Sequence, residues 1–324
     1  MKALVTGGAG FIGSHLCEAL IRRGDQVFVL DDLSSGQFEN IEHLEGLTCV
    51  IDTALNQEIV RDLVREVDVV YHLAATVGVQ LVVDDPIETI NNNVRGTETV
   101  LEQACRYRRR VLITSTSEVY GKSTKEVFEE DDDRVMGSTH LTRWSYAESK
   151  ALDEFLAFSF WRTKRMPCVI VRLFNTVGPR QTGRYGMVIP RFVKQALRNE
   201  PLTVYGDGKQ TRCFGYVGDV VPALIELMNR RDIVGQVFNL GNTERITIHA
   251  LAERIIAKTG SKSEIKLVPY NEAFGAGYED MLHRAPCLNR IKAAIGYEPK
   301  TKLDEILNQV IADMRRRMDA GTDS

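Results

Sequence analysis

One stretch near the start decides the fold of this chain: Lys2-Ala-Leu-Val-Thr-Gly-Gly-Ala-Gly-Phe-Ile-Gly13. Apolar residues with strand character come first, and Gly8, Gly10 and Gly13 follow at the G-x-G-x-x-G spacing. Glycine allows a tight turn and lets the backbone approach a pyrophosphate, whose charge a helix N-terminus stabilises. An amphipathic segment from Phe11 to Arg23 supplies that helix. Strand, glycine turn and helix in this order predict a dinucleotide-binding unit.

The next strand of this unit, Gln26 to Leu30, ends in an acid, Asp31. An acid about twenty residues beyond the glycines accepts a hydrogen bond from the ribose 2′-hydroxyl of the dinucleotide. In NADP that hydroxyl carries a phosphate, so Asp31 predicts NAD as the cofactor. A glycine turn with a purely steric purpose is the alternative, and the strand before it and the helix after it argue against that reading.

Strands and helices alternate along the first half of the chain, and most of the strands are continuous apolar runs. This pattern is typical of a parallel sheet that is buried on both faces. We therefore predict an α/β fold, a Rossmann-type doubly wound parallel sheet with a smaller mixed α/β domain. The NAD-binding domain is expected at 1–175, with a helix and strand near 215–241 returning to it, and the substrate-binding domain at 176–324.

Composition narrows the class of protein further. The chain has 324 residues and a formal net charge of −3, which gives no reason to expect nucleic acid or an anionic membrane as a partner. Its six cysteines lack C-x-x-C spacing, so neither a metal site nor a disulfide framework is predicted. No apolar run is long enough to span a bilayer. We expect a cytoplasmic protein.

The segment Tyr146-Ala-Glu-Ser-Lys150 places a phenol and an ammonium at i and i+4 on one face of a helix. A neighbouring cation stabilises a phenolate and lowers the pKa of the tyrosine, and a positively charged nicotinamide ring acts in the same direction. The pair is expected to serve as a base near neutral pH. It would take a proton from a sugar hydroxyl while the carbon of that alcohol gives a hydride to NAD.

The chain resembles the extended short-chain dehydrogenase/reductases that modify nucleotide sugars, and the resemblance runs nearly from end to end. The residues that carry it are Thr6 to Gly13, Asp31, His72 to Ala75, Asn93, Thr116, Tyr146, Lys150, Arg172 to Asn175, Gly178 to Arg180, Tyr205 to Gly208 and Arg212. The resemblance implies that Thr116, Tyr146 and Lys150 form a hydroxyl–tyrosine–lysine catalytic triad.

The same resemblance implies two sets of binding residues. The expected cofactor-binding residues are Gly7, Gly10, Phe11, Ile12, Gly13, Asp31, Asp32, Asp52, Leu73, Ala74, Ala75, Asn93, Tyr146 and Lys150. The expected substrate-binding residues are Arg143, Asn175, Val188, Tyr205, Arg212 and Tyr278. Asn175 and Arg212 would hold a diphosphate, and the segment from Val188 to Tyr205 a uracil. For Arg212, a surface ion pair with Asp207 or Asp219 is the alternative.

Two further stretches resemble UDP-glucuronate decarboxylases, the UDP-xylose synthase-like members of this group. The first, Thr116-Ser-Glu-Val-Tyr-Gly121, carries Glu118 where simple 4-epimerases usually have a small residue. The second, Tyr278-Glu-Asp-Met-Leu-His-Arg-Ala-Pro286, carries Arg284 shortly before a proline. The segment Arg143-Trp-Ser-Tyr146 strengthens the resemblance, whereas Cys287 stands where an acid is common.

The expected chemistry is consistent with these residues. Oxidation at sugar C4 creates a ketone β to the carboxylate on C5, so carbon dioxide can leave while the electrons delocalise into an enolate. Glu118 is expected to orient or deprotonate sugar groups, and Arg284 and Ser117 to hold the carboxylate and the enolate. Arginine is a poor acid, so we interpret Arg284 first as an electrostatic stabiliser.

Other functions remain open from the sequence. A UDP-hexose 4-epimerase, acting on UDP-glucose or UDP-glucuronate, uses the same triad without losing carbon. In a nucleotide-sugar 4,6-dehydratase, a glutamate at position 118 would remove the C5 proton, and Arg284 could contact a diphosphate in any of these enzymes. A non-catalytic NAD-binding scaffold of the same fold typically lacks the tyrosine or the lysine, and this chain has both.

The expected partners follow from the same resemblance. The small-molecule partner is a UDP-sugar, and no nucleic acid, membrane or metal is expected. Two long helices, predicted at 87–107 and 145–164, have apolar faces that permit a homodimer built as a four-helix bundle.

Overall fold

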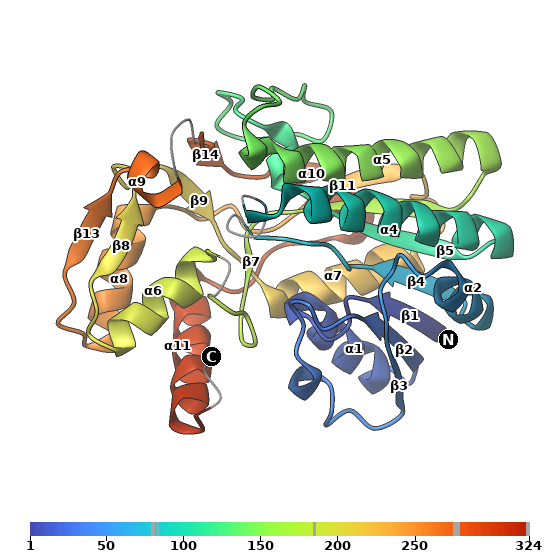
Figure 1. The fold of residues 1–324 in the computed structure, drawn as a ribbon, viewed down its shortest axis with the longest axis horizontal. Helices are drawn as coiled ribbons and strands as arrows, with labels where there is room; N and C mark the ends of the chain where they lie inside the picture. The colour runs from blue at the N-terminus through green and yellow to red at the C-terminus, as the bar shows by residue number, and fades with distance from the viewer. Residues whose placement is uncertain (79–81, 83, 184–185, 275–278, 322–324) are drawn as a thin grey trace.

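The computed structural model describes residues 1–78, 82, 84–183, 186–274 and 279–321. Its centre is a seven-stranded sheet in the order β11-β6-β5-β4-β1-β2-β3, in which every neighbouring pair is parallel (Figure 1). The strands are β1 (Lys2–Thr6), β2 (Gln26–Asp31), β3 (Leu47–Ile51), β4 (Val69–His72), β5 (Arg110–Thr116), β6 (Cys168–Leu173) and β11 (Gln236–Leu240). The strand order reverses between β1 and β4, and a ligand crevice is expected at such a switch point.

Helices cover both faces of this sheet, which confirms the predicted doubly wound fold. One face packs against α2 (Gln57–Glu66), α4 (Pro86–Tyr107) and α5 (Ser145–Lys164). The other packs against α1 (Phe11–Arg22), α7 (Val217–Asn229) and α10 (Asn289–Ile295). The interior strands are therefore buried on both sides, which explains why their sequences are continuously apolar.

Local capping explains where the long helices begin and end. The side chain of Asp85 accepts from the backbone N–H of Glu88, and Pro86 occupies the first turn of α4. Arg108 ends that helix in the left-handed region, with φ of 55°. β5 runs to Thr116 because its ladder with β6 continues to the pair Thr116–Leu173.

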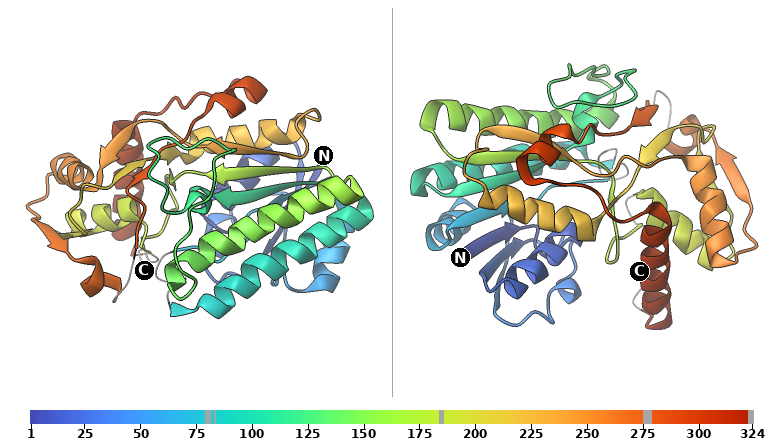
Figure 2. Two further views of the ribbon diagram at one scale, coloured as in Figure 1. Left: turned by 90° about the horizontal axis from the view of Figure 1, so that it is seen from above. Right: turned by 180° about the vertical axis from the view of Figure 1, so that it is seen from behind.

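A second, smaller region follows β6 along the chain and lies beside the sheet (Figure 2). Its short strands are β7 (Thr176–Val177), β8 (Leu202–Tyr205), β9 (Thr211–Cys213), β10 (Gly215–Tyr216), β12 (Arg245–Thr247), β13 (Ile265–Val268) and β14 (His283–Arg284). Its helices are α6 (Val188–Leu197), α8 (Ile248–Thr259), α9 (Tyr270–Phe274) and α11 (Leu303–Asp319). The apolar faces of α6, α8 and α11 share one core. The domain boundary after residue 175 stays a prediction.

Two features of this architecture position the site. β14 pairs with β9 so that Arg284 lies opposite Arg212 in the register. Three short helical turns join the sheet to its surroundings: η1 (Phe38–Asn40), η2 (Ser117–Tyr120) and η3 (Thr142–Trp144).

Across the described residues, no helix has both the length and the apolar character that crossing a bilayer requires.

Candidate active site

Two cavities meet at the carboxyl ends of the central strands. The first, which we call the glycine cavity, has a volume of about 310 Å³ and borders the glycine turn after β1. The second, the arginine cavity, has a volume of about 180 Å³ and is lined by four arginines, Arg143, Arg191, Arg212 and Arg284. Their walls share the side chains Val77, Glu118, Tyr146, Asn175, Met187 and Arg284.

The glycine cavity gathers nearly all of the predicted cofactor-binding residues. Its walls include Gly7, Gly10, Phe11, Ile12, Gly13, Asp31, Asp32, Asp52, Leu73, Ala74, Ala75, Tyr146 and Lys150. They come from the end of β2, from the start of α1, from loops that follow β1, β2, β3 and β4, and from α5. The predicted cofactor residues therefore line one continuous space.

Glycine is required at two positions of this turn for steric reasons. A Cβ atom at residue 13 would lie 2.0 Å from the carbonyl oxygen of Gly7, a distance at which atoms overlap. Gly7 itself has a φ of +71°, and a Cβ there would lie 2.8 Å from the backbone nitrogen of Ala74. Side chains are therefore absent at these two positions, where the cavity passes between β1 and β4.

Asp31 is anchored at the end of β2. Its Oδ2 accepts from the N–H of Ala9 and its Oδ1 from the N–H of Leu33, each at 2.9 Å. Burial raises the pKa of Asp31 above its ordinary value, although these backbone donors oppose the shift. Its carboxylate borders the cavity with lone pairs to spare, as recognition of a ribose hydroxyl requires.

Asn93 lies apart from the other predicted cofactor residues. It is buried and does not line the glycine cavity, whereas its neighbour Asn92 does. The Asn93 side chain accepts from the N–H of Thr76 at 2.8 Å and donates to Ser149 Oγ at 3.1 Å. It therefore fixes the loop after β4 to α5, and its contact with the cofactor stays a prediction.

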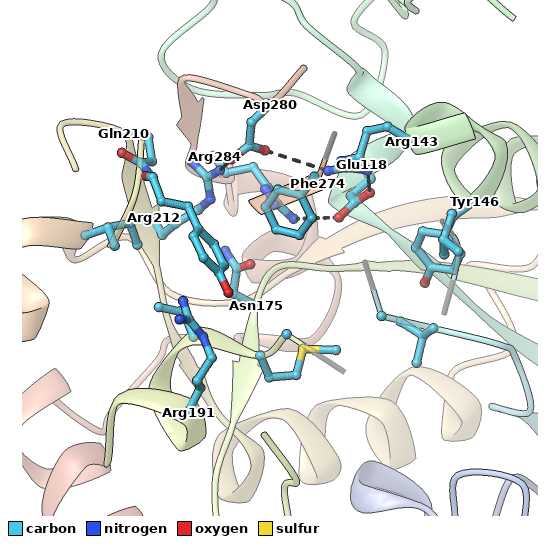
Figure 3. A pocket seen from close by; sticks show the side chains of 18 of the residues that line it. Glu118, Arg143, Tyr146, Asn175, Arg191, Gln210, Arg212, Phe274, Asp280 and Arg284 are labelled. Atoms are coloured by element: carbon cyan, nitrogen blue, oxygen red, sulfur yellow. Dashed lines mark hydrogen bonds and ion pairs between the residues drawn. The ribbon is translucent and has the colours of Figure 1, made fainter. Parts of the chain in front are cut away.

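The residues of the predicted triad are brought together at the junction of the two cavities. Thr116 ends β5, and Tyr146 and Lys150 lie one turn apart near the start of α5. The Thr116 hydroxyl hydrogen-bonds to Tyr146 and lowers its pKa, and its oxygen also accepts from the N–H of Glu118 at 3.2 Å. The phenol of Tyr146 lines both cavities (Figure 3).

The protonation of Tyr146 differs from the expectation. Burial and the nearby Glu118 carboxylate raise its pKa above the ordinary value, and the Thr116 hydrogen bond only partly offsets them. Lys150 does not act on the phenol as a free cation, since its ammonium donates to Asp153 Oδ2 at 2.7 Å. The side chains of this protein thus favour the protonated tyrosine, contrary to the lowered pKa expected from the sequence.

The arginine cavity is built around two carboxylates, of which that of Glu118 is buried and that of Asp280 half-buried (Figure 3). Glu118 accepts from Arg143 Nη1 at 2.5 Å and from Arg284 Nη1 at 3.3 Å. Asp280 accepts from Arg212 Nη2 at 2.9 Å, and Arg143 Nη2 lies 3.7 Å from its other oxygen. Three guanidinium groups against two carboxylates leave one excess positive charge, so the cluster favours an anionic ligand.

Both carboxylates stay ionised. Burial alone would raise the pKa of Glu118, but Arg143 and Arg284 together hold that pKa below its ordinary value. For Asp280, Arg212, Arg143 and Arg284 likewise outweigh burial and lower the pKa. A carboxylate with a lowered pKa is a weak base. The geometry therefore favours Glu118 as the group that orients ligand and arginines, the first of its two predicted roles, over proton removal.

The predicted substrate residues lie in this cavity where they are described. Arg143, Asn175, Val188, Tyr205 and Arg212 line it, and Tyr278 lies outside the described residues. The surface ion pair considered for Arg212 is wrong, because this side chain is buried and its acidic partner is Asp280. Asn175 has a φ of +34°, an unusual value for a residue other than glycine and one that is common at functional sites.

Sequence reasoning missed three residues of the arginine cavity. Asp280 belongs to the decarboxylase-like stretch 278–286, but no role was predicted for it. It lies between Arg143 and Arg212 and organises the cluster. Arg191 stacks on Tyr205, with its guanidinium carbon 4.3 Å from the ring centroid, and Gln210 lines the same wall. Arg191 lies on α6 inside the segment predicted to hold uracil, so it could have been proposed from the sequence as a substrate-binding residue.

Several buried polar atoms on the wall of the glycine cavity have no hydrogen-bond partner among the described residues. They are Ser117 Oγ, Thr176 Oγ1, Gln181 Oε1 and Arg284 Nε. An unsatisfied buried polar group costs free energy, so such atoms are expected where a ligand completes their hydrogen bonds. Together with the bare glycine turn, they fit a polar dinucleotide in this cavity.

Comparison with known proteins agrees with this geometry. A family model described as GDP-mannose 4,6 dehydratase matches residues 4–310. The UDP-N-acetyl-alpha-D-glucosaminuronate decarboxylase of Bacillus cytotoxicus is 41% identical over 96% of this chain and 96% of its own, and UDP-glucuronic acid decarboxylase 1 of Arabidopsis thaliana is 39% identical over 98% and 71%. The crystal structure of UDP-glucuronic acid 4-epimerase from Bacillus cereus, in complex with UDP-glucuronic acid and NAD, is 28% identical, with a TM-score of 0.88 over 98% of this chain and 99% of that one.

The residues that the family model matches, 4–310, include the glycine turn, the triad and the arginine cavity. The chain therefore belongs to the GDP-mannose 4,6 dehydratase family of extended short-chain dehydrogenase/reductases.

Proposed function

We propose that this protein is an NAD-dependent decarboxylase of a UDP-linked uronic acid. The observation that carries the proposal is the meeting of Tyr146, Glu118 and Arg284 on the wall shared by both cavities. Tyr146, as the base for a sugar hydroxyl, and Arg284, as the cation for a carboxylate, thus lie on the same wall. The relatives named as decarboxylases of UDP-glucuronic acid and of its N-acetylated analogue support the same reaction class.

The glycine cavity is the proposed NAD site. Gly7, Gly10 and Gly13 leave room for the pyrophosphate at the N-terminus of α1, and Asp31 accepts from the adenosine ribose. NAD held there would supply the acceptor for a hydride from sugar C4, and the product would be a pentose if that hydride returned after the loss of carbon dioxide. Lys150 presents its remaining N–H donors to the cavity.

Tyr146 is the proposed base. It lies where a sugar in the arginine cavity would face a nicotinamide in the glycine cavity, and Thr116 donates to its oxygen. The burial that raises its pKa in the protein alone is opposed, in the complex, by the positive charge of the oxidised cofactor. The tyrosine takes the proton of the C4 hydroxyl as the ketone forms.

Loss of carbon dioxide then follows from the position of the ketone. The bond between C5 and the carboxylate carbon breaks, and its electron pair delocalises onto the C4 oxygen as an enolate. Arg284 lies near enough to Tyr146 to lower the pKa of the phenol, so its charge reaches this oxygen. The unpaired Ser117 hydroxyl can donate to the same group, and a proton returns to C5 from the site.

The charge of the arginine cavity suits a substrate that is anionic at two places. Arg212 would bind the diphosphate, and Arg143 and Arg284 would lie toward the sugar carboxylate. Arg191 and Tyr205 form a planar platform on the far wall that suits a uracil ring. A neutral hexose would leave the excess positive charge of the cluster uncompensated.

The test is incubation of the purified protein with NAD and separate nucleotide sugars, followed by proton NMR. The panel contains UDP-glucuronate, UDP-N-acetylglucosaminuronate, UDP-glucose and dTDP-glucose. A pentose or a 4-keto pentose from one of the uronates, with release of carbon dioxide, is the expected outcome. Conversion of a uronate to its C4 epimer with all carbons retained would identify a 4-epimerase, and a 4-keto-6-deoxy sugar a dehydratase.

The epimerase is the second candidate because a solved 4-epimerase that binds UDP-glucuronic acid shares the fold over nearly its whole length. Both reactions begin with oxidation at C4, and both need a cation for the carboxylate. Glu118 and Arg284 form an ion pair beside Tyr146, whereas simple 4-epimerases usually have a small residue at position 118. This difference favours decarboxylation.

The same proposal includes a homodimer in the cytoplasm. α4 and α5 run side by side on the outside of the molecule (Figure 2), and they expose Ile87, Ile90, Leu152 and Phe155, the first and last at 73% and 62%. Burying these side chains against a second copy would form a four-helix bundle. The six cysteines are free, as a reducing compartment would leave them. A monomeric mass in light scattering at micromolar concentration would contradict the dimer.

A further inference from the structure

The lysine of the triad has a partner that the proposed chemistry does not use. Lys150 Nζ donates to Asp153 Oδ2 at 2.7 Å, and the two side chains are 2% and 0% exposed. Asp153 lies three residues further along α5, so the pair spans one turn of a single helix. The carboxylate lies beneath the ammonium and away from the glycine cavity, whose wall includes Lys150 and not Asp153.

We propose that Asp153 is a positioning residue, which holds the Lys150 ammonium in one orientation toward the cofactor cavity. The inference rests on the proposed function, since it concerns how the lysine of that triad is held. An ammonium has three donors, and only one of them is occupied by Asp153. The other two stay available to hydroxyl groups in the glycine cavity.

A chain of buried polar groups fixes Asp153 in turn. The Thr97 hydroxyl on α4 stabilises its carboxylate and contacts His72 Nε2 at 3.0 Å. His72 Nδ1 lies 2.7 Å from Thr6 Oγ1, which accepts from the N–H of Ala74 on the cavity wall at 3.2 Å. Burial and the Lys150 charge lower the pKa of His72 to about 3, so this ring stays neutral and serves only as a hydrogen-bonding link.

Stability alone is a poor explanation for this ion pair. Burying two charges costs desolvation energy that their attraction only partly offsets, and apolar residues commonly pack as well. The Asp153 Oδ1 atom has no hydrogen-bond partner within the described residues, which adds to that cost. An arrangement that is expensive for folding and adjoins the reacting centre is more readily explained by the orientation of Lys150.

The pair also has a consequence for Tyr146. The negative charge of Asp153 is one of the causes that raise the pKa of the phenol, after burial and Glu118. Other charged groups that act on these side chains are Arg284 from β14, which lowers the pKa of Tyr146, and Glu154 on α5, which raises that of Asp153. Removing the Asp153 charge should therefore make the phenol ionise at lower pH.

The experiment compares Asp153→Asn with wild type. We expect NAD affinity, measured by calorimetry, to fall several-fold because Lys150 is no longer held. We expect the acid limb of the kcat/KM profile to move toward lower pH by about one pH unit, the lower end of the effect of one neighbouring charge. Ultraviolet titration of phenolate, taken as the difference from Tyr146→Phe, should show the same displacement without any sugar present.

The matched control is Asp313→Asn on α11, which removes another buried aspartate whose partners include Arg316 and Arg317. It should leave NAD affinity and the pH profile unchanged. If Asp153→Asn keeps both at wild-type values, or lowers the rate equally at all pH values, the proposal is overturned. Should that variant not fold, Asp153→Ser is measured in its place, with the same expected changes.

The phenolate titration and NAD binding do not depend on turnover. A protein that fails to convert any nucleotide sugar, but whose Tyr146 titration moves on loss of Asp153, would therefore contradict the proposed function and support this inference. The reverse result would contradict the inference alone.

Discussion

The glycine cavity and the arginine cavity share a wall but are built differently. The first follows the backbone at the ends of neighbouring parallel strands, where glycines leave space. The second is formed by charged side chains from η2, η3, β9 and β14, which are far apart in the sequence. One is therefore defined by shape and the other by a balance of charge.

This difference predicts how substitutions in each cavity impair ligand binding. A Cβ atom added to the glycine turn overlaps backbone atoms that cannot move away. NAD binding is therefore lost, while the charge of the cavity is unchanged. Removing one charge from the arginine cluster leaves its partners buried and unpaired, which costs more than the lost contact itself. Variants of the two kinds should consequently separate cofactor binding from sugar chemistry.

The largest effect is expected at the wall that both cavities share. Tyr146→Phe removes the proton acceptor without changing the shape of either cavity, so turnover should fall by a factor of about 10² to 10⁴ while NAD affinity stays the same. Product formation by NMR and NAD binding by calorimetry measure the two quantities. Tyr107→Phe, at the far end of α4, is the matched control and should keep full activity. Substantial activity in Tyr146→Phe would refute the assigned base.

A smaller effect is expected for Arg284→Ala, on the wall that both cavities share. Release of carbon dioxide should fall by a factor of about 10² to 10³, the usual cost of one electrostatic stabiliser. The control is Arg245→Ala on β12, which removes a more exposed guanidinium that pairs with Glu126. Release at the wild-type rate by Arg284→Ala would leave that residue without a chemical role.

The converse test concerns the glycine cavity. Gly13→Ala places a Cβ atom 2.0 Å from the Gly7 carbonyl oxygen, and NAD affinity should fall by at least about tenfold, or ~1.4 kcal/mol. Gly96→Ala, in α4, is the control because its Cβ would lie 3.5 Å from the nearest atom, an ordinary contact. That variant should bind NAD normally and gain up to ~1 kcal/mol from better helix propensity. Equal affinities in the two variants would contradict the steric argument.

The same contrast explains what could be predicted from the sequence. The glycine turn and Asp31 are contiguous motifs at the ends of strands, so the fold and this part of the cavity followed from local pattern, whereas the residues after β4 were expected only from the family resemblance. Asn93 was expected at the cofactor from the family resemblance. Its side chain accepts from the N–H of Thr76 in the loop after β4, and its contact with the cofactor stays a prediction.

The arginine cavity depends on information that no local pattern contains. β14 pairs with β9 so that Arg284 lies opposite Arg212, and Asp280, which precedes β14, forms an ion pair with Arg212. These contacts join segments far apart along the chain. The pKa of Tyr146 was predicted in the wrong direction because burial, Glu118 and Asp153 all oppose ionisation. Spacing along α5 revealed the lysine but not the carboxylate that engages it.

The smallest expected effect is on stability in acid, and it tests the charge balance without any ligand. Arg143 and Arg284 lower the pKa of Glu118 from its ordinary value of 4.5, so the folded state binds this proton less tightly than the unfolded chain does. The resulting stabilisation is present above about pH 4.5 and is lost as pH falls through the lowered pKa. A tenfold difference in proton affinity between the folded and unfolded states corresponds to about 1.4 kcal/mol of stability.

Urea denaturation of wild type and Glu118→Gln from pH 7 to pH 3 measures this quantity. Wild type should be the more stable protein at neutral pH, and the difference should shrink as the solution becomes acidic, because the glutamine has no proton to bind. Glu298→Gln, whose carboxylate pairs with Lys292 at the surface, should follow wild type throughout, since solvent screens that pair. A difference that stays constant with pH would show that the Glu118 charge is not held by the arginines, and that the arginine cavity is maintained by packing rather than by charge.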